Sequence, residues 1–128
     1  MKYAVDLEGT KIEAKPGIKG ICPICKSKVH AKCGVYKEWH FAHDSNKDCD
    51  AWGEVETQWH IDWKNYFSKE YQEVIINKNN KMHRADVKLP NGLIIEFQNS
   101  PITLSEVIKR SSFYENIIWI VNCIPYLK

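Results

Sequence analysis

The sequence predicts a mixed α/β protein, with a small N-terminal β module followed by a core whose element order is αβββαβ. Two observations lead to this prediction. Residues 1–51 hold four of the five cysteines and have too little apolar content for a core of their own. Residues 52–128 show a helical apolar period, three strand-like runs, a second helix and a final apolar strand, which together predict a mixed sheet.

Length and charge narrow the class of protein. The 128 residues suit one domain, or one domain plus a very small module. The net charge of +2 does not by itself indicate a nucleic-acid-binding protein, because such domains are usually strongly basic. No apolar run approaches the ~20 residues of a membrane span. The N-terminus lacks the apolar core of a signal peptide, so a cytoplasmic location is expected.

In the N-terminal module, short β-prone pieces alternate with turns: Lys2–Val5, Lys11–Ala14, Lys28–Lys32 and Trp39–Ala42. A helix is expected to begin near Trp52, because apolar residues recur at helical spacing. This stripe consists of Val55, Trp59, Trp63, Tyr66 and Phe67. A second stripe at spacing four consists of Glu56, His60 and Lys64.

Three strand-like runs follow: Tyr71–Asn77, Met82–Leu89 and Leu93–Gln98. The Pro-Asn-Gly link between the last two predicts a hairpin. A second helix is expected from Thr103, which begins a capping box with Glu106. Leu104, Val107, Ile108 and Ser111 would then fall on one face of this helix. The continuously apolar run 117–121 predicts a strand that is buried on both faces.

The motif Cys22-Pro-Ile-Cys25 indicates a metal site. In a reducing compartment such a pair is more typical of metal binding than of a disulfide. His40 and His43 would complete a tetrahedral Cys2His2 zinc site of the structural, closed kind. Cys49 with His43 would serve as well, and Cys33 is a weaker candidate. Unligated cysteines are the competing interpretation, and a thioredoxin-like redox pair fits less well because no βα unit carries it.

Two acidic residues interrupt the last two strand-like runs. Asp86 and Glu96 would lie on adjacent antiparallel strands, and alternation places Gln98 on the same face as Glu96. Two close carboxylates repel each other unless a cation lies between them, and Mg²⁺ is commonly held by one or two carboxylates and substrate phosphate. A phosphodiester-cleaving site is therefore predicted. Ordinary strand-end and edge-strand charges explain the spacing about equally well.

Glu56, His60 and Lys64 place an acid, an imidazole and an amine on one predicted helix face. They could line a cleft. Taken alone, the spacing favours a solvated face with polar i, i+4 pairs.

Taken in order along nearly the whole chain, these motifs resemble the competence protein CoiA-like family. The resemblance rests on Cys22-Pro-Ile-Cys25, His40-Phe-Ala-His43, Asp48-Cys49-Asp50, Glu56 to Lys64, His83-Arg-Ala-Asp86, Ile95-Glu96-Phe-Gln98, Phe113-Tyr114 and Ile118 to Val121. It implies a zinc-ribbon-like module over 1–51 and a nuclease core of the PD-(D/E)xK, or restriction-endonuclease-like, superfamily over 52–128.

The resemblance also implies roles for single residues. Asp86 and Glu96 match the metal-binding acids of the core strands, and Glu56 matches the acid of the first core helix. His60 and Lys64 stand where the family carries His and Lys. Gln98 departs from the usual superfamily Lys, which leaves the stabilisation of the developing charge to another group. The candidates for that role are Lys64, Lys88 and His83.

The predicted function is hydrolysis of DNA with Mg²⁺ or Mn²⁺ bound by Asp86 and Glu96, and with structural Zn²⁺ in the N-terminal module. A catalytically silent, zinc-containing DNA-binding module is the main alternative. A zinc-stabilised protein-interaction domain is a weaker one. The near-neutral charge suggests that a second copy or a protein partner completes the grip on nucleic acid, and no membrane partner is expected.

Overall fold

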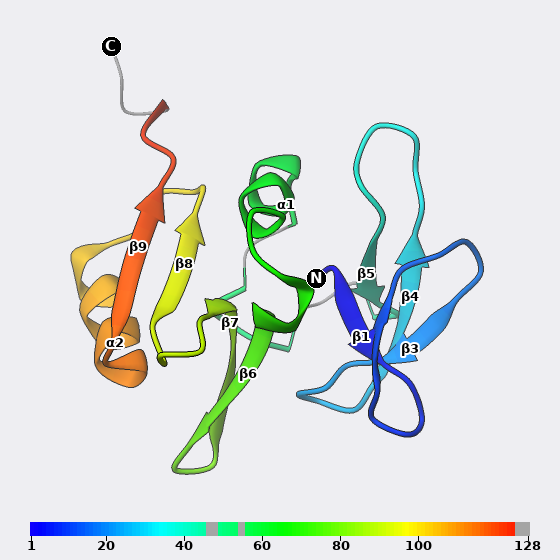
Figure 1. The fold of residues 1–128 in the computed structure, drawn as a ribbon, viewed down its shortest axis with the longest axis horizontal. Coiled ribbons are helices and arrows are strands. Elements are labelled where there is room, and N and C mark those ends of the chain that lie inside the picture. The colour runs from blue at the N-terminus through cyan, green and yellow to red at the C-terminus, as the bar shows by residue number, and fades with distance from the viewer. Residues whose placement is uncertain (46–48, 54–55, 125–128) are drawn as a thin grey trace.

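The computed structural model describes residues 1–45, 49–53 and 56–124, which form two sheets (Figure 1). The first sheet is antiparallel and has the strand order β2-β1-β3-β4-β5. Its strands are β1 (Tyr3–Val5), β2 (Lys11–Glu13), β3 (Lys19–Ile21), β4 (Lys28–Lys32) and β5 (His40–His43). The backbone N–H of Phe41 in β5 donates to the carbonyl of Met1, so the N-terminus of the chain is tied to the far strand of this sheet.

The second sheet is mixed and has the order β6-β7-β8-β9. Its first three strands are antiparallel, and β9 joins β8 in parallel. The elements of this part are α1 (Gln58–Lys64), a short 3₁₀ helix (Lys69–Tyr71), β6 (Gln72–Lys78), β7 (Lys81–Lys88), β8 (Ile94–Gln98), α2 (Leu104–Tyr114) and β9 (Ile117–Val121). The mixed α/β class and the predicted order of helices and strands are confirmed. The division into domains at residue 51 stays a prediction.

Alternation along β8 separates two core clusters. Ile95 and Phe97 pack with Val87 against Trp59 and Trp63, on the α1 side. Ile94 packs with Ala85 against residues of α2. The first sheet has its own cluster around Val29 and Phe41. Each sheet thus has a packed face.

The start of the first helix differs from the prediction. It begins at Gln58, because the Thr57 side chain accepts the backbone N–H of His60 and caps the helix there. Glu56 therefore precedes the helix, and the prediction that it lies on the helix is wrong. Tyr66 lies beyond the helix end and is 80% exposed, so it is not part of the buried stripe. Val55 falls outside the described residues.

The C-terminal elements show which faces are covered, and one prediction about them is wrong. Thr103 does cap α2 by accepting the N–H of Glu106, but Leu104 and Ile108 face solvent. The helix buries the side of Tyr114 instead. The run Ile117–Val121 was expected to be buried on both faces, but β9 is the edge strand and is only partly covered. Periodicity alone does not separate an edge strand from a central one. No helix in the described ranges is long and apolar enough to cross a membrane.

Ile61 and Tyr66 provide a test of this packing. Ile61 is fully buried, so Ile61→Ala should lower the free energy of unfolding by about 2–5 kcal/mol. Tyr66→Ala should change it by less than about 0.5 kcal/mol, because the ring is exposed. Urea unfolding of both variants measures the difference. Equal losses would show that α1 does not pack as described.

Candidate metal centre and acidic site

Three cysteines and one histidine of the N-terminal sheet converge. The ligand atoms of Cys22, Cys25, His43 and Cys49 all lie within 4.8 Å of one another. Cys22 Sγ is 3.6 Å from Cys49 Sγ, and Cys25 Sγ is 3.5 Å from His43 Nε2. Ligands about 2.3 Å from a tetrahedral zinc ion are about 3.8 Å apart, so the spacing suits such an ion. We refer to these four residues as the Cys/His cluster.

A tight turn after β3 presents the two cysteines of the CxxC motif. The N–H of Cys22 donates to the Ser27 carbonyl, and the N–H of Lys26 donates back to the Cys22 carbonyl. Lys26 has φ of 63°, which closes the turn. His43 comes from β5, on the strand face that also carries the buried Phe41. The local backbone thus aims both thiols of the motif at a histidine on a neighbouring strand.

The chemistry of the cluster also suits a cation. Burial raises the pKa of the Cys49 thiol to about 12, and the neighbouring Cys22 adds to this rise. Burial would also raise the pKa of Cys25, but hydrogen bonds with Ser27 and His43 lower it to about 6. Several thiolates cannot share such a small space without a positive charge to balance them. The cluster could therefore hold a metal ion such as zinc.

His40 is not a member of this cluster, so its assignment as the fourth ligand is corrected in favour of Cys49. His40 and His43 are three residues apart on a strand, which places their side chains on opposite faces. His40 Nδ1 contacts the Glu38 carbonyl at 3.1 Å instead. In the described part of the chain, Cys33 does not join a metal-binding group either.

A second site lies between α1, β7 and β8. All six residues predicted to act in catalysis line one cavity of about 50 Å³, which has room for a few water molecules. These residues are Glu56, His60, Lys64, Asp86, Glu96 and Gln98. Other polar residues that line the cavity are Asp50, Glu73, Arg84 and Arg110. We refer to this cavity as the acidic site.

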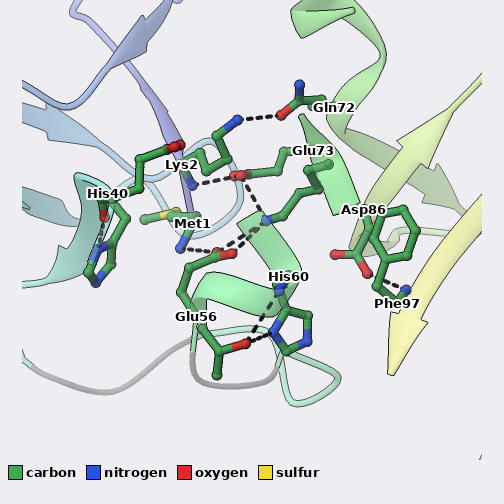
Figure 2. Close-up of polar contacts among 12 residues, drawn as sticks. Met1, Lys2, His40, Glu56, His60, Gln72, Glu73, Asp86 and Phe97 are labelled. Atoms are coloured by element: carbon green, nitrogen blue, oxygen red, sulfur yellow. Dashed lines mark hydrogen bonds and ion pairs between the residues drawn. The ribbon is translucent and has the colours of Figure 1, made fainter. Parts of the chain in front are cut away.

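The two strands diverge where they supply their carboxylates. The register between β7 and β8 contains two pairs, Val87 with Ile95 and Lys88 with Ile94. Beyond them, the backbone N–H of Asp86 donates to Glu96 Oε2 at 2.8 Å. The N–H of Phe97 donates to Asp86 Oδ2 at 2.8 Å, as Figure 2 shows. Side-chain carboxylates thus replace strand carbonyls as acceptors, which separates the strands and opens the cavity.

Burial gives this carboxylate pair an unusual affinity for protons. It raises the pKa of Glu96 well above its ordinary value, and the nearby charge of Asp86 adds to the rise. Burial also raises the pKa of Asp86, although Lys64 opposes this. The positive charges nearby thus do not balance the pair, and a proton or a bound cation would relieve the repulsion.

Lys64 is buried within a cluster of opposite charges. Its Nζ lies 2.9 Å from Glu56 Oε1 and 3.2 Å from Glu73 Oε2. The N-terminal ammonium of Met1 lies 3.0 Å from Glu56 Oε2. Burial would lower the pKa of Lys64, but Glu73 and Glu56 outweigh it and raise that pKa above its ordinary value. Lys64 thus brings a fixed positive charge to the edge of the acidic site.

The structure pairs Glu56 with two ammonium groups, those of Lys64 and Met1. Burial would raise its pKa, but the ammonium groups of Lys64 and Met1 lower it far below the ordinary value. Its negative charge is already balanced. A second metal ion would have to displace an ammonium group.

His60 and Gln98 both face the cavity in fixed orientations. His60 Nδ1 lies 2.7 Å from the Thr57 hydroxyl oxygen, which sets the direction of the ring. Gln98 Nε2 donates to the Ser100 carbonyl at 2.9 Å, just past the end of β8. Of the other groups proposed to stabilise charge, Lys88 is exposed and does not line the cavity. His83 pairs with Asp50, so Lys64 is the lysine that the fold brings to this site.

Comparison with known proteins now places the N-terminal part of the chain. Residues 10–51 match the family described as competence protein CoiA, N-terminal domain. This segment contains the whole Cys/His cluster. The N-terminal third of the chain is therefore similar to the N-terminal domain of competence protein CoiA.

Over 43 residues the chain is 40% identical to the competence protein CoiA of Bacillus subtilis (strain 168). This CoiA-like match covers 34% of the chain and 12% of that protein's length. No solved structure gives a significant match to the chain.

Asp50, at the end of the CoiA-like segment, was missed as a functional candidate. Its Oδ1 lies 2.8 Å from His83 Nδ1, and its Oδ2 accepts the backbone N–H of Arg84 at 3.0 Å. Trp52 stacks on His83, with ring centroids 3.3 Å apart. Asp50 therefore joins the CoiA-like module to β7 two residues before Asp86. No local motif predicts this contact, because Asp50 and Arg84 are 34 positions apart in the sequence.

Glu73 was missed as well. It accepts the backbone N–H of Lys2 at 2.6 Å besides its ion pair with Lys64, and its φ is 52°. Such a backbone conformation is costly for a residue other than glycine and tends to occur at functional sites. An acidic residue inside the apolar run 71–77 was the available signal in the sequence.

The identity of the fourth ligand can be tested by metal analysis. Cys49→Ser should reduce bound zinc from about one ion per chain, because it removes one of four ligands. His40→Ala should keep the ion, because His40 lies on the opposite strand face. Mass spectrometry of freshly purified protein gives both values. Zinc lost from His40→Ala and retained in Cys49→Ser would contradict the assignment.

The raised carboxyl pKa values predict how stability depends on pH. Between the ordinary carboxyl pKa, about 4, and the raised values, the folded chain binds more protons than the unfolded chain. Stability without a divalent ion at the acidic site should therefore fall as pH rises through this window. Glu96→Gln should flatten the fall, as seen in Tm between pH 5 and 8. Asp62→Asn, at an exposed carboxylate, is the control. Identical pH profiles for wild type and Glu96→Gln would refute the prediction.

Proposed function

We propose that this chain is a metal-dependent nuclease that hydrolyses DNA phosphodiester bonds and acts in competence, in DNA uptake or processing. The observation that supports this most is the convergence of six residues, predicted from sequence, on one cavity. At its centre are two buried carboxylates whose repulsion a cation would relieve. The name of the CoiA relative supports the link to competence.

Asp86 and Glu96 would hold Mg²⁺ or Mn²⁺, since hard divalent ions take carboxylate oxygens and substrate phosphate as ligands. When bound, such an ion supplies Lewis-acid polarisation of the phosphate and a lowered pKa for an attacking water molecule. A single ion fits this arrangement better than two, because Glu56 is already neutralised by Lys64 and Met1.

The other residues would position and balance charge. Lys64 places an ammonium group beside the carboxylates of Glu56 and Glu73. It would take the role of the lysine that the superfamily usually has at the position of Gln98 on β8. His60, oriented by Thr57, can transfer a proton at its other ring nitrogen. The amide of Gln98, held by Ser100, can orient water or a phosphate oxygen.

The chain would be organised in two parts. Residues 1–51 would form a zinc-ribbon-like module with structural Zn²⁺ bound by Cys22, Cys25, His43 and Cys49. Residues 52–128 would form a nuclease core of the PD-(D/E)xK type, which the αβββαβ order supports. A catalytically silent DNA-binding module remains the second candidate, because Gln98 stands where the superfamily usually has Lys and is held by Ser100.

Isosteric removal of one charge at a time tests the nuclease proposal. Asp86→Asn or Glu96→Gln should lower Mg²⁺-dependent DNA cleavage at least ~100-fold. The ion's stabilisation of charge is worth several kcal/mol, and each 1.36 kcal/mol is a factor of ten in rate. Plasmid and oligonucleotide cleavage with Mg²⁺ or Mn²⁺ gives the rates, and Mn²⁺ binding by electron paramagnetic resonance separates ion binding from chemistry.

Asp62→Asn on the outside of α1 is the matched control and should cleave at the wild-type rate. Cleavage at the wild-type rate by a purified Asp86→Asn, Glu96→Gln double variant would reject the site. A wild-type protein that binds DNA but neither binds Mn²⁺ nor cleaves would favour the silent module.

A further inference from the structure

The outer face of β3 and β4 carries lysines that the acidic site does not use. Lys28, His30 and Lys32 alternate along β4 with the fully buried Val29 and with Ala31. Lys19 of β3 pairs directly with His30. Because strand side chains alternate and directly paired residues share a face, Lys19, Lys28 and Lys32 lie on one side of the sheet. All three are exposed, and we call them the lysine face.

The near-neutral net charge conceals this concentration of basic residues. Residues 14–37 hold six of the 18 Lys and Arg residues and none of the 16 Asp and Glu residues. The rest of the chain is left with 12 basic and 16 acidic residues. Charge is therefore unevenly distributed along the chain, with a basic segment at 14–37 and an acidic remainder. A basic patch on one face is the electrostatic footprint of nucleic-acid binding.

Within the described residues, the lysine face has no acidic partners. Lys64, Lys69 and Lys78 each form an ion pair with a glutamate. Across 1–45, 49–53 and 56–124, the ion pair on this face joins His30 to Asp44, and the three lysines of the face form none. Their charges are thus available to an external anion.

The face is suited to anchoring and not to chemistry. In Figure 1, β3 and β4 lie on the far side of β1 from β6–β9. None of the three lysines lines the acidic site. Lys28 and Lys32 are four positions apart on one strand, which corresponds to about 13 Å. They therefore form a row that can follow an extended polyanion.

We propose that the lysine face binds the phosphate backbone of nucleic acid without reading its bases. The inference rests on the proposed nuclease function and deepens it, because it assigns the substrate grip to the CoiA-like module. A membrane surface is less suitable, since peripheral binding also needs inserted apolar side chains. The exposed apolar side chains nearest to this face, Val35 and Tyr36, lie in the loop after β4, and none of the exposed large apolar residues in the described ranges lies on β3 or β4 itself.

The test is the salt dependence of binding in wild type and in two matched double variants. Lys28→Ala/Lys32→Ala removes two charges from the face. Lys81→Ala/Lys109→Ala removes two exposed charges elsewhere and is the control. Fluorescence anisotropy with a labelled DNA duplex, single-stranded DNA and single-stranded RNA is measured from 0.05 to 0.3 M salt. Divalent ions are omitted to prevent cleavage, and chelators are omitted to keep the Cys/His cluster loaded.

The Lys28→Ala/Lys32→Ala variant should lower the slope of log K against log salt by about 1.8 on duplex, or by about 1.4 on a single strand. At 0.1 M salt this corresponds to a roughly 60-fold or 25-fold loss of affinity. The control should change the slope by less than about 0.5. In the wild-type background, Lys19→Ala should lower the slope by ~0.9 on duplex. Unchanged zinc content and Tm would show that the variants fold.

Equal changes of slope in the two double variants would show that only the overall charge matters, and would overturn the proposal. An unchanged slope in Lys28→Ala/Lys32→Ala would overturn it as well. Anionic vesicles and polyglutamate are measured in parallel. A variant that loses binding to either while keeping its nucleic-acid affinity would overturn it too. Cleavage with Mg²⁺ separates the two ideas. A wild type that binds through the lysine face without cleaving contradicts the nuclease function alone, and one that cleaves while the slope is unchanged contradicts the lysine face alone.

Discussion

The buried ammonium of Lys64 is the interaction on which the arrangement of the protein depends. It joins Glu56, which precedes α1, to Glu73 on β6. Through Glu73 it also reaches the first sheet, because that carboxylate accepts the backbone N–H of Lys2. A buried charge that loses one partner typically costs 3–5 kcal/mol, so each member of the cluster constrains the others. The two sheets and the first helix are thus held together by charges as well as by apolar packing.

The acidic site exists because two strands stop pairing. A continuous ladder between β7 and β8 would bury Asp86 and Glu96 without a cavity and satisfy their backbone groups by carbonyls. Instead, each carboxylate accepts an N–H from the opposite strand. The left-handed backbone of Glu73 lies beside this divergence, in the gap between the pairs Gln72–Val87 and Val74–Ala85. Non-glycine residues in that conformation cost about 1–3 kcal/mol, so local strain accompanies the opening.

Local patterns in the sequence predicted the elements well where the cause was local. The Pro-Asn-Gly turn and the Thr103 cap depend on neighbouring residues, and both the β7–β8 hairpin and the start of α2 follow. The spacing of His60 and Lys64 also predicted that they share a helix face, and both line the cavity. The fourth ligand was misassigned because a histidine pair three residues apart faces one way on a helix and two ways on a strand.

What could not be predicted arises from contacts between distant segments. Asp50 with Arg84, and Glu73 with Lys2, join residues 34 and 71 positions apart, and no periodicity reports them. The exposure of β9 follows from its place at the edge of the sheet, which depends on the complete topology. The charge asymmetry was readable from the sequence, but the overall sum concealed it.

Cys49 and Asp50 are joined by a single peptide bond, yet one belongs to the Cys/His cluster and the other fastens β7. Because the two residues are adjacent, a fixed position of Cys49 limits the positions that Asp50 can take, and a fixed position of Asp50 limits those of Cys49. If a metal ion in the Cys/His cluster strengthens the contact of Asp50 with Arg84, that contact favours binding of the ion by the same free energy, since such coupling is reciprocal. The cluster and the acidic site thus share one mechanical element, and a disturbance of the first is transmitted to the strand that carries Asp86.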